Sequence, residues 1–489
     1  MSTNNGENDL SQKHSSGSLL APQATGGDIA EGGFRYQANL ITAQIPSWLA
    51  EDGFTEMIRE SLGDVEAKFF IPNVGLTREF VEYKNHLLQP TEFWEEVENF
   101  WEKDKHDPDS YQRFVLACTS ISGGLKPIIN ALRRIRDAFP FYDGSKQIQD
   151  TSYNDFVNRV KKHGKSKDLA DFLFSKVHFK IDLTDAEDFP RELFREALLN
   201  HFPNSENFPV KTSNDAYACL VELISSRKNQ PIYRRELEKA IWQEVPEKDR
   251  PESTIKIHTL YDESTNKGAD GCLQFDWKSF FGGSERNFPS PEEWNQKVIG
   301  ELRATKDWLV ATNRKRHIHL SGHRRLSASI AIGSIFSAVS GFTVGMEIRD
   351  GVWWTNSHAN EDTPDYQWQQ SIGGESTDEI AVGISILKNT ANEEVKQYLQ
   401  MERFHGRQLY LYSDMVLESD DQTNRAVQKA KSMIQEFVSK LQEKKIHLFF
   451  AGPAQFALFL GHRLNTIGKI QCYERTSPNA YVPTVLIKT

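Results

Sequence analysis

The chain has 489 residues, which allows roughly two to four domains and excludes a single small module. Its 38% hydrophobic and 26% charged residues are typical of a soluble protein. With 58 Lys and Arg against 68 Asp and Glu, the net charge is -10, so any DNA contact must use a local basic surface. The four cysteines form no CxxC pair, which argues against zinc and a disulfide framework and favours the reducing cytoplasm.

Two segments bear on export and membrane insertion. Residues 1–27 are rich in Ser, Asn, Gly and Gln without an apolar core, so they predict a disordered tail and not a signal peptide. Residues 326–346 are uncharged and about as long as a membrane span, but five Ser, one Thr and three Gly interrupt them. They predict a buried helix followed by a strand, and we expect no membrane association.

Residues 28–150 predict an α+β domain. A helical pattern begins at Gly32, and two strand-like runs, 65–71 and 79–83, flank a turn containing Pro and Gly. An amphipathic helix follows, whose glutamates, Glu92, Glu95, Glu96, Glu98 and Glu102, are expected to form a solvated face. Residues 113–120 predict a buried strand, which completes the order helix, hairpin, helix, strand.

Three charged residues of the hairpin form a candidate metal site. Glu82 and Lys84 lie two apart on a strand and share a face, and the hairpin can bring Asp64 beside them. Two neighbouring carboxylates suit a hard cation such as Mg2+, and Lys84 could orient a water or offset charge in the transition state. Glu66 shares a face with Asp64 and is an alternative ligand. The alternative interpretation is a surface salt bridge between Glu82 and Lys84, with Asp64 as part of the turn.

The placement of these residues resembles the PD-(D/E)xK nuclease superfamily over about residues 26–150. The resemblance implies a restriction-endonuclease-like core that hydrolyses DNA phosphodiesters with Mg2+. It also implies that Asp64 and Glu82 bind the metal and that Lys84 is catalytic.

The first helix adds a fourth candidate. Residues 32–37, with the sequence GGFRYQ, are similar to the opening helix of one branch of that superfamily, in which Gln or Glu faces the metal. The resemblance therefore makes Gln37 a further catalytic candidate. The chain departs from the superfamily signature at Gly63, because the signature has Pro before the Asp.

Residues 151–297 predict a mainly helical linker module. The segment 230–237 begins a helix in a way familiar from small helical DNA-binding domains. A passive spacer is the alternative interpretation.

From residue 298 to 489, strands and helices alternate, which predicts an α/β domain. The strands are expected at 316–320, 342–348, 352–355, 380–387, 409–412, 446–450 and 469–473, with a hairpin turn at Asp350-Gly351 and helices at 325–336 and 426–441. Within this domain, a strand, a turn at Gly322 and a helix containing Gly333 parallel a strand, a turn at Gly452 and a helix containing Gly461. The repeat predicts two Rossmann-like halves facing each other, as in a receptor for a ligand with near-repeating parts.

Two turns in this domain are candidates for ligand contact. Residues 314–325 contain five Lys or Arg, three His and no acid, and end at a strand-to-helix turn where an anionic ligand could bind Arg324 or Arg325. The second turn offers Gly452, Pro453 and Gln455 to a phosphate or ribose. A solvated face is the alternative interpretation of the basic run.

The consecutive tryptophans Trp353 and Trp354 lie on one predicted strand. One of them must face away from the core, either as an edge or interface residue or as a stacking plate for a base.

The blocks at 338–342 and 446–453, together with Trp353-Trp354 and Gly461, are similar to the SAVED sensor domain of bacterial antiphage defence, which resembles two fused CARF-like halves. With the nuclease-like segment, the chain resembles the effector endonucleases of CBASS operons. The resemblance implies that a cyclic oligonucleotide second messenger, expected to be a cyclic trinucleotide, activates cleavage of double-stranded DNA.

Two alternative functions remain open: a nucleotide-sensing regulator without nuclease activity, and an unregulated restriction-type nuclease. For the activated nuclease we expect a ligand-induced homo-oligomer, because one metal site attacks one strand at a time and head-to-tail docking brings two nuclease domains together. Gating within one chain by the helical middle is the alternative.

Overall fold

The computed structural model describes residues 22–142, 144–184, 186, 188–243, 245–251, 254–262, 270–348, 351–356, 360, 362–375, 379–439 and 445–488. Residues 1–21 of the predicted tail lie outside this range, and residues 22–27 form the first turns of a helix. The chain divides into two compact units, which are described separately. The amino-terminal unit contains the chain up to Ser47 together with Met57–Glu66 and Glu79–Asp249, and the carboxy-terminal unit contains Trp48–Glu56, Ala67–Arg78 and Arg250–Thr489.

Up to Asp249 the elements are α1 (Pro22–Ala50), β1 (Phe54–Arg59), β2 (Val65–Ile71), β3 (Gly75–Leu88), α2 (Pro90–His106), β4 (Tyr111–Ile121), α3 (Lys126–Ala138), η1 (Phe139–Tyr142), α4 (Lys146–Lys161), α5 (Lys167–Lys176), β5 (Val177–Lys180), α6 (Phe189–His201), η2 (Pro203–Asn207), α7 (Val210–Ser226), β6 (Ile232–Tyr233), α8 (Arg234–Trp242) and η3 (Glu247–Asp249). The sheet order is β5-β4-β3-β2-β1-β6. The predicted hairpin and the buried strand are confirmed as β2, β3 and β4.

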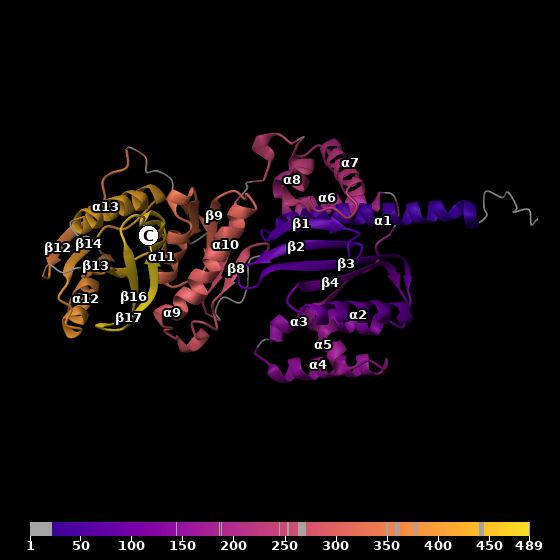
Figure 1. Ribbon diagram of the computed structural model, residues 1–489, viewed down its shortest axis with the longest axis horizontal. Helices are drawn as coiled ribbons and strands as arrows, with labels where there is room; N and C mark the ends of the chain where they lie inside the picture. Colours follow the sequence, from indigo (N-terminus) through magenta and orange to yellow (C-terminus); the bar gives the residue numbers. More distant parts are fainter. Residues whose placement is uncertain are drawn as a thin grey trace, which may run out of the picture. The chain divides into compact units, whose positions relative to one another are not determined.

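A hydrophobic core joins the sheet to the helices that follow the hairpin. It includes Phe80 of β3, Phe93 and Phe100 of α2, Phe114 of β4 and Phe156 of α4. In Figure 1, α2 to α5 lie toward β4, whereas α6 to α8 lie beside β1. The helical region 151–249 is not separate from the sheet, because β5 pairs with β4 and β6 extends the edge beside β1.

From Arg250 the elements are β7 (Ile255–Leu260), β8 (Leu273–Asp276), η4 (Gly283–Glu285), α9 (Pro291–Trp294), η5 (Asn295–Ile299), α10 (Gly300–Ala311), β9 (His317–Gly322), α11 (Leu326–Ile335), η6 (Ala338–Ser340), β10 (Thr343–Glu347), β11 (Trp353–Thr355), β12 (Gln369–Gly373), β13 (Glu379–Ile386), α12 (Asn389–Met401), β14 (Arg407–Ser413), α13 (Asp420–Val438), β15 (Lys445–Ala451), α14 (Ala454–Arg463), β16 (Lys469–Ser477) and β17 (Ala480–Lys488). All the strands expected after residue 298 are present. Asp350 and Leu441, which the sequence placed in a hairpin turn and a helix, lie outside the described residues.

Two mostly parallel sheets form this unit, with orders β11-β10-β9-β7-β8 and β12-β14-β13-β15-β16-β17. A domain that began at residue 298, as the sequence predicted, would divide the first sheet. The strands β7 and β8 precede residue 298, and β7 pairs in parallel with β9. In the second sheet, α12 and α13 lie on opposite sides (Figure 1), as right-handed crossovers in opposite directions require.

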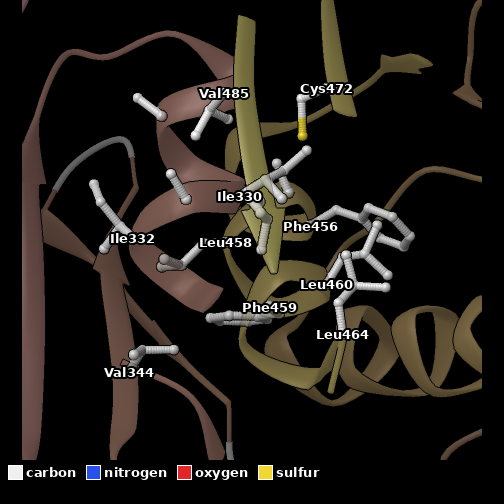
Figure 2. Close-up of a cluster of buried hydrophobic side chains, with 14 of the residues drawn as sticks. Ile330, Ile332, Val344, Phe456, Leu458, Phe459, Leu460, Leu464, Cys472 and Val485 are labelled. Carbon is white, nitrogen blue, oxygen red and sulfur yellow. The ribbon is translucent and has the colours of Figure 1, made fainter. Parts of the chain in front are cut away.

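The predicted repeat is confirmed as β9 followed by α11 and β15 followed by α14. These two helices cross at their glycines, because a Cβ on Gly333 would lie less than 3.0 Å from Leu458 O and a Cβ on Gly461 less than 3.0 Å from Ile330 O. Figure 2 shows apolar side chains from the two helices and from β10, β16 and β17 gathered around this crossing. Residues 326–346 therefore form a buried helix followed by a strand. None of the helices in the described part of the chain is long and apolar enough to cross a bilayer.

Candidate functional site

The four candidate residues of the amino-terminal unit lie together. Asp64 precedes β2, Glu82 and Lys84 lie on β3, and Gln37 lies on α1. Gln37 Nε2 donates to Asp64 Oδ1 at 2.8 Å, and the backbone N–H of Tyr83 donates to Asp64 Oδ2 at 2.6 Å. Lys84 Nζ lies 3.2 Å from Glu82 Oε1. The structure thus brings residues from three elements to one point, as the sequence predicted.

The turn before β2 explains why glycine occupies position 63. The N–H of Glu60 donates to Asp64 O at 2.9 Å, which closes the turn. A Cβ on Gly63 would overlap the ring of Phe80, which is 1% exposed and fixed in the core, so a side chain is excluded where the superfamily signature has Pro. Glu66, the alternative ligand, is buried and accepts a hydrogen bond from the N–H of Leu62 at 3.3 Å.

The electrostatics of the cluster suit a cation. Burial, followed by the charge of Glu82, raises the pKa of Asp64 from 3.8 to about 7, and burial also raises the pKa of Glu82. Burial lowers the pKa of Lys84, but hydrogen bonding to Glu96 and the charge of Glu82 outweigh it, so the net shift is upward. Burial thus makes ionisation of both carboxylates less favourable, and a bound cation would offset part of this cost.

The donor set fits Mg2+, which is typically held by one or two carboxylates, several waters and substrate phosphate. Among the described residues no group of three or more His, Cys, Asp or Glu side chains forms a complete protein cage for a metal. Asp64 and Glu82 are the two residues that would hold the ion.

One residue of this cluster, Glu96, was missed. Glu96 of α2 was expected on a solvated face, but its Oε1 lies 2.7 Å from Lys84 Nζ and its side chain is 18% exposed. A helical wheel could have found it, because at about 100° per residue Glu96 lies roughly 60° from Phe93 and 40° from Phe100, both buried.

In the carboxy-terminal unit, the side chain of Arg325 makes internal contacts. Its side chain is buried at 5% exposure, with the guanidinium carbon 4.4 Å from the ring centre of Phe281 and 4.8 Å from that of Phe288. Its Nε lies 3.7 Å from Glu474 Oε2. Aromatic residues upstream in the sequence therefore cover the charge of Arg325, and its contact with a ligand stays a prediction.

Arg324 fills the crevice between the carboxyl ends of β7 and β9. Its Nη1 donates to Gly322 O at 2.8 Å and to Thr259 Oγ1 at 3.2 Å, and burial lowers its pKa to about 10. The first sheet reverses its strand order between β7 and β9, which is where ligands bind in open α/β sheets. In this half Arg324, the expected ligand residue, lies at that position.

The corresponding crevice in the second half, between β13 and β15, is open. A cavity of about 240 Å³ lies there, at the carboxyl ends of the strands. Its lining comprises Ile384, Lys388, Thr390, Ala391, Asn392, Glu394, Val395, Phe449, Phe450, Ala451, Arg475 and Tyr481. Gly452, Pro453 and Gln455 follow the lining residue Ala451 directly, and all three are half-buried. The polar lining residues Lys388 and Asn392 were missed because nothing in the sequence marks the turn after β13.

The two tryptophans alternate as expected. Trp353 is 38% exposed and stacks on His319 with ring centres 4.6 Å apart, whereas Trp354 is 9% exposed and belongs to the core. Trp353 is therefore the one that can meet a ligand or a partner.

Comparison with known proteins gives concordant results. Residues 301–487 match the family model of the SMODS-associated and fused to various effectors sensor domain, SAVED. The chain is 29% identical over 476 residues to CD-NTase-associated protein 4 of Moraxella osloensis, covering 96% of this chain and 99% of that protein.

Solved structures match over a similar length. The Acinetobacter baumannii Cap4 SAVED/CARF-domain containing receptor with the cyclic trinucleotide 2'3'3'-cAAA has a TM-score of 0.78 and 23% identity, covering 94% of this chain and 99% of that one. The Moraxella osloensis Cap4 SAVED/CARF-domain containing receptor has a TM-score of 0.75 and 25% identity, covering 93% and 99%. The resemblance to a SAVED-bearing CBASS effector is confirmed, because residues 301–487 match the SAVED family model and the chain is similar over almost its whole length to CD-NTase-associated protein 4.

Proposed function

We propose that this protein is a CBASS effector, a Mg2+-dependent endonuclease that cleaves double-stranded DNA in the bacterial cytoplasm when its SAVED domain binds a cyclic oligonucleotide. The observation that carries the proposal is the meeting of Gln37, Asp64, Glu82 and Lys84 at one point. This set also supports a restriction-endonuclease-like core for the amino-terminal unit.

Each residue has a distinct role in hydrolysis. Asp64 and Glu82 would hold Mg2+, which polarises the scissile phosphate and acidifies water when bound. Gln37 and the N–H of Tyr83 fix the two oxygens of Asp64, so this carboxylate is oriented before DNA arrives. Lys84, with its pKa raised, stays protonated and can offset negative charge on the phosphate.

The proposed activator is a cyclic trinucleotide. The Acinetobacter baumannii receptor binds two such molecules, 2'3'3'-cAAA and 3'3'3'-cAAA. In this chain, the open crevice beside Gly452, Pro453 and Gln455 and the exposed ring of Trp353 are the proposed contacts.

Activation by head-to-tail assembly completes the proposal, because a ligand bound by one sensor can complete a docking surface for a second. Light scattering with and without the activating nucleotide tests it. Growth of the particle on activation is expected, and a monomer that cleaves at full rate contradicts assembly.

Incubation of supercoiled plasmid with protein, Mg2+ and either cAAA isomer tests the nuclease. We expect linear fragments from the wild type, none from Lys84→Ala, and wild-type cleavage from Lys105→Ala, a matched change on the exposed end of α2. Lys84→Ala should retain cyclic-trinucleotide binding. An intact plasmid under all conditions would leave a nucleotide-sensing regulator, and cutting without nucleotide would indicate an unregulated nuclease.

A further inference from the structure

Lys84 has two carboxylate partners rather than one. Its Nζ lies 3.2 Å from Glu82 Oε1 and 2.7 Å from Glu96 Oε1. Glu82 belongs to the same strand, whereas Glu96 comes from α2. The closer partner is thus supplied by a separate element.

Glu96 is held in place by the packing of its helix. Phe93, Val97 and Phe100 of α2 are each at most 1% exposed and belong to the core that α2 shares with β3 and β4. Since these anchors lie three residues before, one after and four after Glu96, its backbone cannot shift along the sheet without disturbing the core. The backbone of Glu96 is therefore fixed beside Lys84, and its carboxylate lies 2.7 Å from the ammonium.

Glu82 and Glu96 differ in what they would contact once Mg2+ is bound. Glu82 is a proposed metal ligand, so its oxygens turn toward the cation in the working enzyme. A lysine ammonium on a flexible four-carbon stem loses precision when a partner is withdrawn. Glu96, which is not in the proposed ligand set, keeps its ion pair with Lys84 in that state.

We propose that Glu96 is the positioning residue for Lys84, which holds the ammonium at the distance from the scissile phosphate that the reaction needs. This inference rests on the proposed nuclease function. Glu96 acts through Lys84 and not on DNA or the metal. Its removal therefore slows the chemical step and leaves DNA binding intact.

The test is single-turnover cleavage of a linear duplex at saturating Mg2+ and 2'3'3'-cAAA. Since a misplacement of 1 Å can cost about a hundredfold, we expect Glu96→Ala to lower the rate constant by roughly 10- to 100-fold. The DNA concentration for half-maximal rate should stay unchanged. Glu96→Gln, which still accepts a hydrogen bond from the ammonium, should recover part of the rate. Glu95→Ala, an exposed change next to it on α2, should match the wild type.

The outcomes separate this inference from the function on which it rests. If the wild type cuts and Lys84→Ala does not, wild-type rates in both Glu96 variants overturn the positioning role alone. A raised half-maximal DNA concentration, or a rate restored by more Mg2+, also overturns it, because Glu96 would then act on DNA or on the metal. A wild type that never cuts refutes both proposals.

Discussion

Asp64→Asn should stabilise the amino-terminal unit at alkaline pH while abolishing cleavage. Asp64 is half-buried, and burial with the charge of Glu82 raises its pKa from 3.8 to about 7. Between these pH values the folded protein keeps a proton that the unfolded chain has released. The free energy of unfolding therefore falls as pH rises from 3.8 to 7 and stays low above 7.

The size of the effect follows from the same two values. A rise from 3.8 to about 7 corresponds to roughly 4 kcal/mol, and partial solvent screening reduces it to about 1–3 kcal/mol. Asparagine removes the charge but still accepts the hydrogen bond from Tyr83, and Gln37 can turn its amide to donate or accept. Asparagine at this position thus keeps both hydrogen bonds and avoids the cost of burying a charge.

Scanning calorimetry in EDTA at pH 8.5 and pH 5 measures the stability difference between Asp64→Asn and the wild type. For a unit of about 200 residues, 1 kcal/mol shifts the midpoint by roughly 2–4 °C. We expect Asp64→Asn to raise the midpoint at pH 8.5 and to keep less than half of that gain at pH 5, whereas exposed Glu95→Gln should show no pH-dependent difference. A lower midpoint at pH 8.5, or an equal gain at both pH values, would refute the desolvation argument.

Three further predictions concern the carboxy-terminal unit. Gly333→Ala should destabilise this unit by about 1–3 kcal/mol, because the methyl group meets the backbone of α14. Gly300→Ala is the control: no atom lies closer than 3.9 Å to its added Cβ, so it should be neutral or stabilising by up to about 1 kcal/mol. Calorimetry compares the two variants. Trp353→Ala should weaken cyclic-trinucleotide binding about tenfold or more in titration calorimetry without lowering the thermal midpoint, and unchanged affinity would leave it an edge residue. Arg325→Ala should cost about 3–5 kcal/mol of stability by removing the ion-pair partner of the buried Glu474, which would keep its hydrogen bond from the Ser327 N–H. A wild-type midpoint with lost ligand affinity would instead support Arg325 as a ligand contact.

Local patterns predicted most of the fold. The β2–β3 hairpin, the internal repeat and the alternation of Trp353 and Trp354 follow from turn residues and periodicity, which act within a few residues of the chain. The strands β1, β5, β6, β12 and β17 were missed, and all of them except β1 lie at an edge of their sheet. The sheet boundary before residue 298 was missed because β7 and β8 join β9 through pairings distant in sequence.

Sequence alone also could not decide which way a charged side chain turns. The basic run at 314–325 predicted an anion site, but Phe281 and Phe288, some forty residues upstream, enclose Arg325. Glu96 shows the reverse case, since a residue at the border of an apolar stripe faces either solvent or the sheet, depending on what the neighbouring strand offers. In this chain the neighbouring strand β3 carries Lys84, and Glu96 turns toward the sheet to form an ion pair with it.

The crossing of α11 and α14 bears on how the proposed sensor could signal. The contacts are reciprocal, with Gly333 against Leu458 and Gly461 against Ile330, so the internal repeat becomes a pair of interlocked helices. At such close approach no flexible side chain lies between the backbones, and one half cannot slide on the other without separating the core shown in Figure 2. A ligand at the open crevice of the second half would therefore meet two halves that cannot slide on each other. A rigid receptor responds more readily by presenting a new surface than by bending, which favours assembly of whole chains as the proposed route of activation.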